Sequence, residues 1–226
     1  SPEFFELERE AIFKRAWLNV GRVEQLRGRG GFFTRELAVA RTSLIIVRGK
    51  DDEIRAFHNV CRHRGNKLVW TDHPAKESSG SCRKFACKYH GWTYELDGRL
   101  SFILQEGEFF GIDKAEYGLV PVHCDVWNGF IFVNLASEPS QTLTEFLGPM
   151  ITAIEYPFEK LTQRYYYRGD IRSNWKVSLD AFQEFYHPPI LHGHQNPVMR
   201  QADYRELGFY TSHFQIDGPH RVGSTT

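Results

Sequence analysis

The sequence has no net charge, few cysteines and no long run of apolar residues. Its 226 residues carry 28 Lys and Arg against 28 Asp and Glu, a balance that argues against a dedicated nucleic-acid binder. Four cysteines are too few for a disulfide scaffold, so any ordered Cys/His pattern is tested first as a metal or redox site. No stretch approaches transmembrane length, and residues 1–10 lack a cationic segment followed by an apolar run. We therefore expect a soluble, cytoplasmic protein without a membrane partner.

What the chain does have is a pattern that changes from helical to β-rich and back. Apolar residues at helical spacing from Phe4 to Ala16, with Gly21 as a stop, predict one amphipathic N-terminal helix. Short β-rich runs then predict a small β-sandwich or open barrel, with strands at 32–34, 43–47, 54–60, 85–96 and 129–135. The polar, proline-containing residues 136–142 predict a linker. Helices are predicted at 143–154 and 174–187, with a Tyr-rich strand at 164–172 between them.

The strongest functional signal is a pair of short segments in the β-rich region that each combine a cysteine with a histidine. They are Cys61-Arg62-His63 and Cys87-Lys88-Tyr89-His90, and Gly91-Trp92 follows the second. Each offers one thiolate and one imidazole from a turn. A [2Fe-2S] cluster with two Cys on one iron and two His on the other needs this mixture. Zinc is the weaker alternative, because zinc sites usually separate the ligands into Cys-x-x-Cys and His-x(3–5)-His pairs.

These segments resemble the Rieske domain of the Rieske non-haem iron ring-hydroxylating oxygenases, whose motif reads Cys-x-His-Arg-Gly followed by Cys-x-Tyr-His-Gly-Trp. Residues 61–65 and 87–92 match it. The resemblance implies that Cys61, His63, Cys87 and His90 hold the cluster. The spacer between the two halves is longer than in most members. We expect its Ser78-Ser79-Gly80-Ser81 stretch to lie in a surface insertion and Cys82 to be a free thiol.

Lysines and arginines gather around the expected cluster in a chain of zero net charge. Charged loops are by default solvated surface. The sharper hypothesis is a docking face for an acidic electron donor, because complementary potentials speed encounter. The residues concerned are Arg62, Arg64, Lys67, Arg83, Lys84 and Lys88.

A second group of metal-ligating side chains lies at the end of the helix predicted at 174–187. Glu184 and His187 are three residues apart and therefore share one helix face. Pro188-Pro189 should end or kink the helix and can bring His192 back towards the same point. Two imidazoles beside a carboxylate suit divalent non-haem iron.

This segment resembles the catalytic motif of the same oxygenases: Asn174-Trp175-Lys176, a carboxylate three residues before a histidine, and a second histidine after four more residues. The resemblance implies that His187 and His192 bind iron. It also implies that Glu184 is the electron bridge to His90 of a neighbouring subunit. Pairing across subunits implies a head-to-tail homotrimer. A ferredoxin and/or a flavin reductase, fed by NAD(P)H, is the implied electron donor.

Together the two resemblances imply an α+β chain, the α (terminal oxygenase) subunit, with three regions. An N-terminal helix, 1–30, would pack on the catalytic part. A small all-β Rieske domain would occupy 31–138, and the start of an α+β mononuclear-iron catalytic domain 139–226. The family's third iron ligand is an Asp farther downstream, and no carboxylate after His192 has a recognisable ligand context. We expect that ligand, and the remainder of the catalytic domain, outside this chain.

The expected activity is that of a terminal oxygenase, in which electrons from the cluster allow the mononuclear Fe(II) to activate O2. The expected substrate is hydrophobic and by default aromatic, to be cis-dihydroxylated, monooxygenated or demethylated, which rests on family analogy. Two other classes stay open. A Rieske-type electron-transfer protein would explain the cluster ligands but leave Glu184, His187 and His192 without a role. A zinc-stabilised binding module would be colourless.

Overall fold

The computed structural model describes residues 1–73, 76–148, 151, 158–160, 169–180, 187–191, 193, 215–217 and 220–222. The chain divides into two compact units. The first comprises residues 1–143 with 158–162, and the second comprises 144–157 with 163–226. The division falls directly after the linker predicted at 136–142, and the units are described separately.

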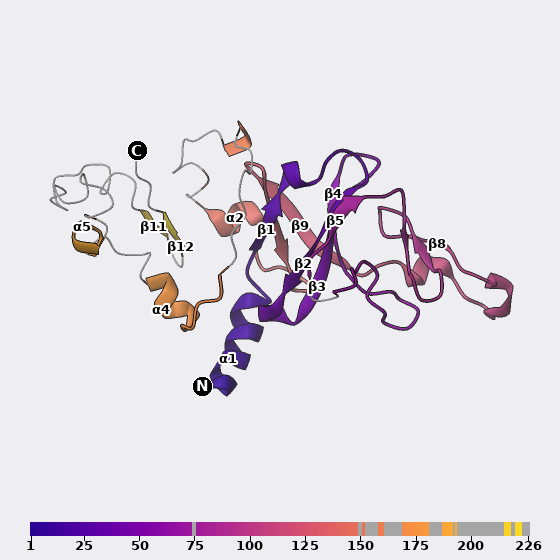
Figure 1. Ribbon diagram of the computed structural model, residues 1–226, viewed down its shortest axis with the longest axis horizontal. Coiled ribbons are helices and arrows are strands. Elements are labelled where there is room, and N and C mark those ends of the chain that lie inside the picture. Colours follow the sequence, from indigo (N-terminus) through magenta and orange to yellow (C-terminus); the bar gives the residue numbers. More distant parts are fainter. Residues whose placement is uncertain are drawn as a thin grey trace. The chain divides into compact units, whose positions relative to one another are not determined.

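The first unit is built on a seven-stranded antiparallel sheet in the order β1-β10-β9-β4-β3-β2-β5 (Figure 1). Its strands are β1 Leu18–Arg22, β2 Gly31–Leu37, β3 Thr42–Arg48, β4 Ile54–His58, β5 Ser79–Ser81, β9 Pro121–Trp127 and β10 Phe130–Asn134. The strands predicted at 32–34 and 43–47 lie within β2 and β3, and those predicted at 54–60 and 129–135 correspond to the shorter β4 and β10.

Strand β3 separates two hydrophobic cores. Its four consecutive apolar residues, 44–47, are all 0% exposed. Successive side chains of a strand point to opposite faces. Leu44 and Ile46 accordingly pack in one core with residues of β1 and β10, whereas Ile45 and Val47 pack in the other with the Cys61 and Cys87 segments. Burial of each such side chain contributes about 1.5–3 kcal/mol to the free energy of folding. The packing of Ile45 and Val47 therefore stabilises the position of the Cys–His segments on one face of the sheet.

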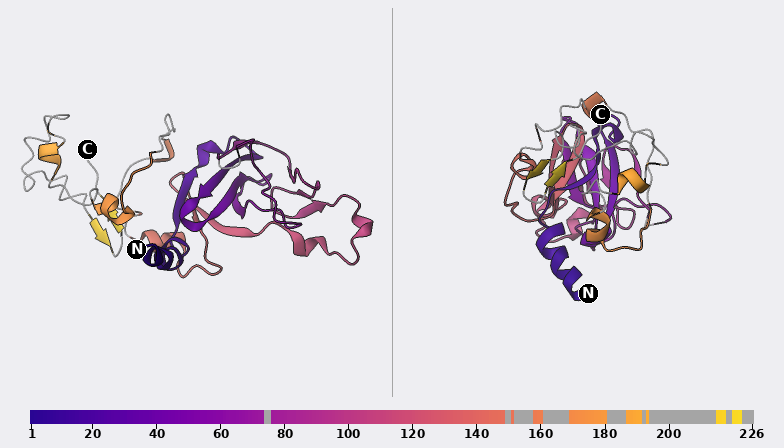
Figure 2. Two further views of the ribbon diagram at one scale, coloured as in Figure 1. Left: turned by 60° about the horizontal axis from the view of Figure 1, so that its bottom comes forward. Right: turned by 90° about the vertical axis from the view of Figure 1, so that its left-hand side faces the viewer.

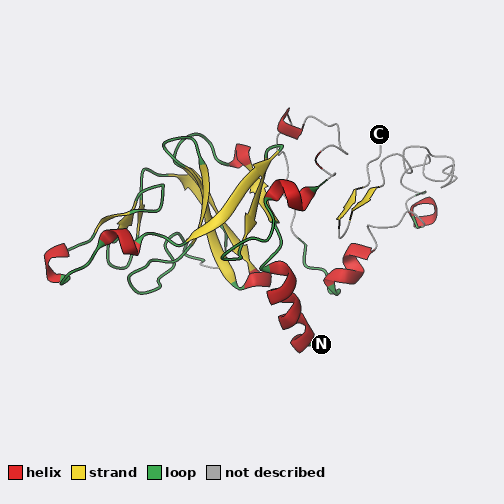
Figure 3. Ribbon diagram, turned by 180° about the vertical axis from the view of Figure 1, so that it is seen from behind, coloured by secondary structure: helices red, strands yellow, loops and turns green. Residues whose placement is uncertain are grey.

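A three-stranded antiparallel sheet supports the Cys–His segments on that face. It consists of β6 Phe85–Ala86, β7 Thr93–Tyr94 and β8 Leu100–Phe102. We call residues 84–119 the small lobe, which projects beyond the large sheet at β8 (Figure 1). Loops make up most of it, with short 3-10 turns at Glu106–Glu108 and Lys114–Tyr117 (Figure 3).

The N-terminal region differs from the single helix predicted for residues 1–30. Helix α1, Pro2–Glu8, continues as a π-helical turn, Arg9–Phe13 (Figure 2). Leu18–Arg22 then forms β1, because its pairing with β10 buries Val20 in the core of the sheet. The buried Arg9 donates from Nε to the Val39 carbonyl at 2.5 Å. This contact lies within the first unit, and the expected packing of residues 1–30 on the catalytic part stays a prediction.

Two expectations for the middle of the chain are also corrected. The strand predicted at 85–96 is two separate strands, β6 and β7, because the turn that carries Cys87 and His90 interrupts it. Ser79–Ser81, expected in a surface insertion, is exposed as expected but forms a strand, the edge strand β5. It pairs with β2 from Gly31 opposite Ser81 to Phe33 opposite Ser79.

The chain after residue 142 is described in pieces. Helix α2 spans Leu143–Leu147, α4 Trp175–Asp180 and α5 Pro188–Leu191, and β11 Gln215–Asp217 pairs with β12 His220–Val222. The proline pair begins α5 rather than only ending the helix before it, because proline suits a first helical turn. Residues 164–168 of the Tyr-rich strand predicted at 164–172 lie outside the described residues, as do residues 181–186 of the helix predicted at 174–187. No helix in the described ranges is long and apolar enough to cross a membrane.

Candidate metal centres

The two Cys–His segments fold into turns with the same backbone pattern. In each, the cysteine N–H donates to the carbonyl five residues on, and the glycine four residues on donates to the cysteine carbonyl. The N–O distances are 2.8 and 3.0 Å in residues 61–66 and 2.8 and 2.9 Å in residues 87–92. Gly65 and Gly91 have φ values of 72° and 73°, a region that glycine adopts without the steric cost paid by other residues. The spacing of Cys and Gly therefore closes each turn on itself.

The turns bring like side chains together in pairs. Cys61 and Cys87 are 2% and 4% exposed and lie in the same hydrophobic core. The imidazole centroids of His63 and His90 are 4.7 Å apart. A pair of sulfurs beside a pair of imidazoles is the donor set of a cluster with two Cys on one iron and two His on the other.

His63 provides the observation that most favours a bound metal. Its Nδ1 is buried and has no hydrogen-bond partner among the described residues. An unsatisfied buried polar atom costs about 1–3 kcal/mol. The ring stacks on Trp92, with centroids 4.8 Å apart and planes 10° apart, and Phe109 packs edge-on at 6.1 Å. Since the ring is held in place, an iron ion at Nδ1 is the partner that this geometry fits.

The electrostatics of the ligands also suit metal binding. Burial raises the pKa of the Cys61 thiol, a shift that the Tyr94 hydroxyl opposes, so the metal-free thiol keeps its proton at neutral pH. A bound cation deprotonates a coordinating thiol. Burial, together with His90 and Arg64, lowers the pKa of His63. Its ring is therefore neutral at pH 7, as a metal ligand must be.

Several residues around the ligands are outside the recognised motif. The Tyr94 hydroxyl lies 3.3 Å from the Cys61 sulfur, and Asn66 Nδ2 lies 3.9 Å from the Cys87 sulfur. Phe109 and Tyr117 each pack on Trp92 with centroids 5.8 Å apart. Trp92, Tyr94 and Leu96 are all buried. Their spacing of two residues is the sequence signal that could have predicted that the Tyr94 side chain points into the core.

The structure separates the cations around this site into paired and unpaired groups. Lys67 pairs with Glu36 at 2.6 Å and Lys84 with Glu95 at 2.7 Å. Lys88 Nζ lies over the Trp70 ring, 4.4 Å from its centroid. Within the described ranges no carboxylate pairs with the exposed residues Arg62, Arg64 and Arg83. A positive surface therefore remains beside His63.

Of the predicted iron-site residues, the structure describes only His187. It is half-buried and directly precedes α5, with its carbonyl accepting from Leu191 N at 2.8 Å. Glu184 and His192 lie outside the described residues, so their convergence with His187 stays a prediction. No group of three His, Cys, Asp or Glu suited to one metal ion occurs in the part of the chain that is described.

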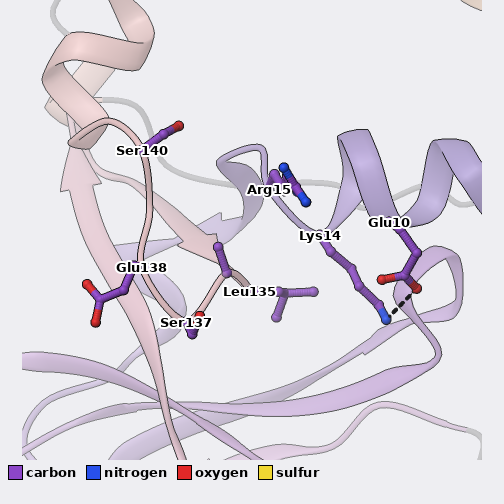
Figure 4. A pocket seen from close by; sticks show the side chains of 8 residues that line it. Glu10, Lys14, Arg15, Leu135, Ser137, Glu138 and Ser140 are labelled. Atoms are coloured by element: carbon purple, nitrogen blue, oxygen red, sulfur yellow. Dashed lines mark hydrogen bonds and ion pairs between the residues drawn. The ribbon is translucent and has the colours of Figure 1, made fainter.

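A separate polar cavity of about 400 Å³ lies in the first unit (Figure 4). It contains none of the predicted metal ligands, and Lys14 pairs with Glu10 of the same helical segment at 2.7 Å. Its lining comes from the π-helical turn, the two residues after it and the segment after β10: Glu10, Lys14, Arg15, Leu135, Ala136, Ser137, Glu138 and Ser140.

Comparison with known protein families matches both halves of the chain. Residues 16–110 match the Rieske [2Fe-2S] domain, and residues 158–226 match the catalytic domain of the ring-hydroxylating α subunit. The chain belongs to the Rieske oxygenase α subunits. The Rieske match of this oxygenase subunit begins before residue 31, in agreement with the membership of β1 in the large sheet.

Individual relatives of this α subunit cover most of it. The glycine betaine monooxygenase oxygenase subunit of Pseudomonas aeruginosa is 36% identical over 186 residues, which are 81% of this chain and 41% of that protein. A quaternary ammonium Rieske monooxygenase, whose structure addresses carnitine oxidation, is similar with a TM-score of 0.74 at 30% identity, over 83% of this chain and 50% of that one. Naphthalene 1,2-dioxygenase is similar with a TM-score of 0.60 at 31% identity, over 68% of this chain and 33% of that one. This chain thus spans about half the length of such relatives or less.

Proposed function

We propose that this Rieske α subunit belongs to a monooxygenase that acts on small quaternary ammonium compounds. The observation that carries the proposal is how far the similarity extends. It covers more of the chain for the quaternary ammonium monooxygenase than for naphthalene dioxygenase. Beside the glycine betaine monooxygenase oxygenase subunit, the curated relatives include a carnitine monooxygenase oxygenase subunit of Acinetobacter pittii and a choline monooxygenase of Spinacia oleracea. This proposal replaces the aromatic substrate expected from sequence, which those relatives do not support.

In this proposal Cys61, His63, Cys87 and His90 are the cluster ligands. The buried, unpartnered Nδ1 of His63 and the paired arrangement of thiols and imidazoles support the assignment. When bound, the cluster supplies one electron at a time and the mononuclear iron supplies the oxygen chemistry. The chain's own contribution at the cluster is to fix the ligands through two closed turns. Trp92 and Phe109 cover the His63 ring and limit its contact with water.

His187 and His192 are the proposed ligands of the mononuclear iron, and Glu184 is the proposed bridge to His90 of a neighbouring subunit in a homotrimer. Support comes from their spacing in the sequence and from the match to the α-subunit catalytic domain over residues 158–226. A carboxylate within hydrogen-bond reach of two imidazoles can orient both rings and hold their tautomers.

Substrate-dependent oxygen uptake tests the proposed activity. The iron-loaded oxygenase with a reductase and NADH should consume oxygen with glycine betaine, carnitine or choline, and mass spectrometry should show a hydroxylated or demethylated product. Benzoate and naphthalene serve as aromatic controls and should give no uptake. Uptake with the aromatic compounds alone would contradict the proposal. Full cluster reduction without uptake for any compound would favour the electron-transfer alternative.

The proposed electron donor is an acidic protein that docks beside His63. Arg62 and Arg64 flank this histidine and are exposed. Cluster reduction by the donor should slow as salt rises, because exposed charges are screened within about 10 Å at 0.1 M. Replacing both arginines by Gln should slow reduction several-fold at low salt. Arg29→Gln, an exposed arginine paired with Asp52, is the matched control. Rates independent of salt would contradict this docking surface.

A further inference from the structure

The two ends of strand β1 hold the chain near both points at which it leaves the first unit. The chain passes to the second unit after Leu143, returns for residues 158–162 and then leaves again. Trp17, the residue before β1, donates a hydrogen bond close to the first point, and Arg22, the last residue of β1, donates one at the second. Neither residue has a role in the function proposed so far.

The first anchor lies next to Leu143. The buried indole of Trp17 donates from Nε1 to the Gln141 carbonyl at 3.0 Å. Leu143 itself is only 2% exposed. The predicted linker, 136–142, is therefore fastened to the first unit at its C-terminal end.

The second anchor is the short 3-10 turn Phe158–Lys160, at the start of the region that matches the catalytic domain. Arg22 donates from Nη2 to the Phe158 carbonyl at 2.7 Å. The Phe158 ring packs on Trp127 of β9 and Phe130 of β10, with centroids 6.1 and 5.6 Å apart. The backbone and the side chain of one residue are thus both held by the large sheet.

The guanidinium of Arg22 is itself held in a fixed position. It pairs with Glu24 and lies over the Phe130 ring, with Cζ 4.4 Å from the ring centroid. Only 13% of the Arg22 side chain is exposed. An added Cβ at Gly129 would lie 3.0 Å from Nη2, so the glycine leaves room for this donor. A hydrogen bond from a charged donor is stronger than one between neutral groups, and partial burial limits competition from water.

Two separated anchors restrict motion more than one does, because a single attachment leaves a hinge. Trp17 and Arg22 are five residues apart in extended chain, which places them roughly 16 Å apart. The strand between them is fixed by its pairing with β10. The segment 144–157 is therefore held at both of its ends by one strand.

We propose that Trp17 and Arg22 are positioning residues that couple the catalytic domain to the unit that carries the cluster. The inference rests on the proposed function, because it concerns electron transfer from the cluster of one subunit to the iron site of its neighbour. A head-to-tail ring closes only if every subunit repeats the same arrangement of its parts. The two anchors limit the arrangements that a subunit can adopt and so preserve the distance that the electron must cross.

Site-resolved trypsin digestion of the iron-loaded oxygenase tests the second anchor directly. Lys160 is exposed, and cleavage after it requires the turn to open locally. Arg22→Gln should speed cleavage after Lys160 several-fold and leave cleavage after Arg55, within β4, unchanged. Arg48→Gln is the matched control, because Arg48 of β3 donates to two backbone carbonyls away from both crossing points. It should leave both cleavage rates at their wild-type values.

Stopped-flow spectroscopy of the same variants links the anchors to electron transfer. Cluster reduction by dithionite should keep its wild-type rate in Arg22→Gln, because the cluster turns are intact. Reoxidation of the reduced cluster by O2, with glycine betaine, carnitine or choline present, should slow by about tenfold, since small misplacements far from the chemistry have effects of this size. Trp17→Phe, which loses only the N–H donor, should show the same pattern. A residue that only stabilised the fold would leave the ratio of the two rates unchanged.

The possible outcomes separate this inference from the proposed function. Wild-type cleavage after Lys160 in folded Arg22→Gln would overturn the anchor, and faster cleavage with unchanged reoxidation would overturn its role in electron transfer. A wild-type protein whose reduced cluster responds to none of the three compounds would overturn the proposed function, while the digestion still decides on the anchor. If Arg22→Gln does not fold, Phe158→Leu removes the aromatic contacts and leaves β1 intact. It should give the same faster cleavage and slower reoxidation, and wild-type rates would contradict the inference.

Discussion

The proposed cluster and iron sites depend on the chain over different distances. The cluster ligands lie on two turns that close on themselves through backbone hydrogen bonds and positive-φ glycines. The proposed iron ligands His187 and His192, by contrast, lie on either side of α5, which the proline pair begins. Their convergence depends on how this segment of the chain turns. A site made of closed turns is specified largely by local sequence, whereas a site spread across helix ends depends on how those helices pack. The two sites should therefore respond separately to substitution.

The largest effect is expected from the cysteines of the first unit. Cys61→Ala should abolish the [2Fe-2S] absorption and the EPR signal of the reduced protein, because one iron loses a thiolate. Cys82→Ala is the control, since burial raises the pKa of that thiol to about 11 and the turn pattern does not include it. It should keep the full cluster signal. Cluster loss in Cys82→Ala with retention in Cys61→Ala would refute the proposed ligand set.

The next effect concerns the independence of the second site. His187→Ala should abolish oxygenase turnover and leave the cluster spectrum and potential unchanged, because the cluster turns make no use of this residue. His123→Ala, an exposed histidine of β9 that contacts the Ser137 carbonyl at 3.0 Å, is the control and should retain turnover. A loss of cluster signal in His187→Ala would show that the two sites are not separable.

A smaller effect tests whether the turns depend on glycine. Gly65→Ala and Gly91→Ala should each lower the free energy of unfolding by about 1–2 kcal/mol, because an alanine at positive φ is strained. An added Cβ would meet no atom within 4 Å at either position, so backbone strain is the expected cause. Gly107→Ala, equally open but without a positive φ, is the matched control. Equal denaturation midpoints for the three variants would contradict the turn account.

The smallest effect concerns the attachment of the small lobe to the sheet. Hydrogen bonds from Lys84 and Lys50 lower the pKa of Glu95 to about 2. Its stabilising contribution should be complete above its ordinary pKa of about 4.5 and lost as the pH falls towards 2. Because both lysines are largely exposed, the effect should be at most about 1 kcal/mol. Glu95→Gln should flatten this part of the stability profile, and Glu108→Gln should not.

The sequence was sufficient for the features that depend on local patterns. The motif histidines His63 and His90 lie together and the motif cysteines Cys61 and Cys87 share one core, while their role as ligands stays a prediction. The strand predicted at 43–47 lies in β3. The edge strands β1 and β5 were not predicted. β1 comes directly after the helically spaced residues 4–16 and was assigned to the same helix, and β5 is rich in Ser and Gly. Both are set by pairing with distant partners. The contact of Tyr94 with Cys61 arises the same way, from the register of β7 between β6 and β8.

Subunit complementation tests the central claim, that a cluster in one subunit serves an iron site in its neighbour. Cys87→Ala subunits lack the cluster, and His187→Ala subunits lack the iron site, so each alone should be inactive. Co-assembled in equal amounts in a head-to-tail trimer, each cluster and iron pair is intact with a probability of about one quarter. The mixture as a whole should therefore regain about a quarter of wild-type turnover. No recovery in folded, mixed trimers would contradict electron transfer between subunits.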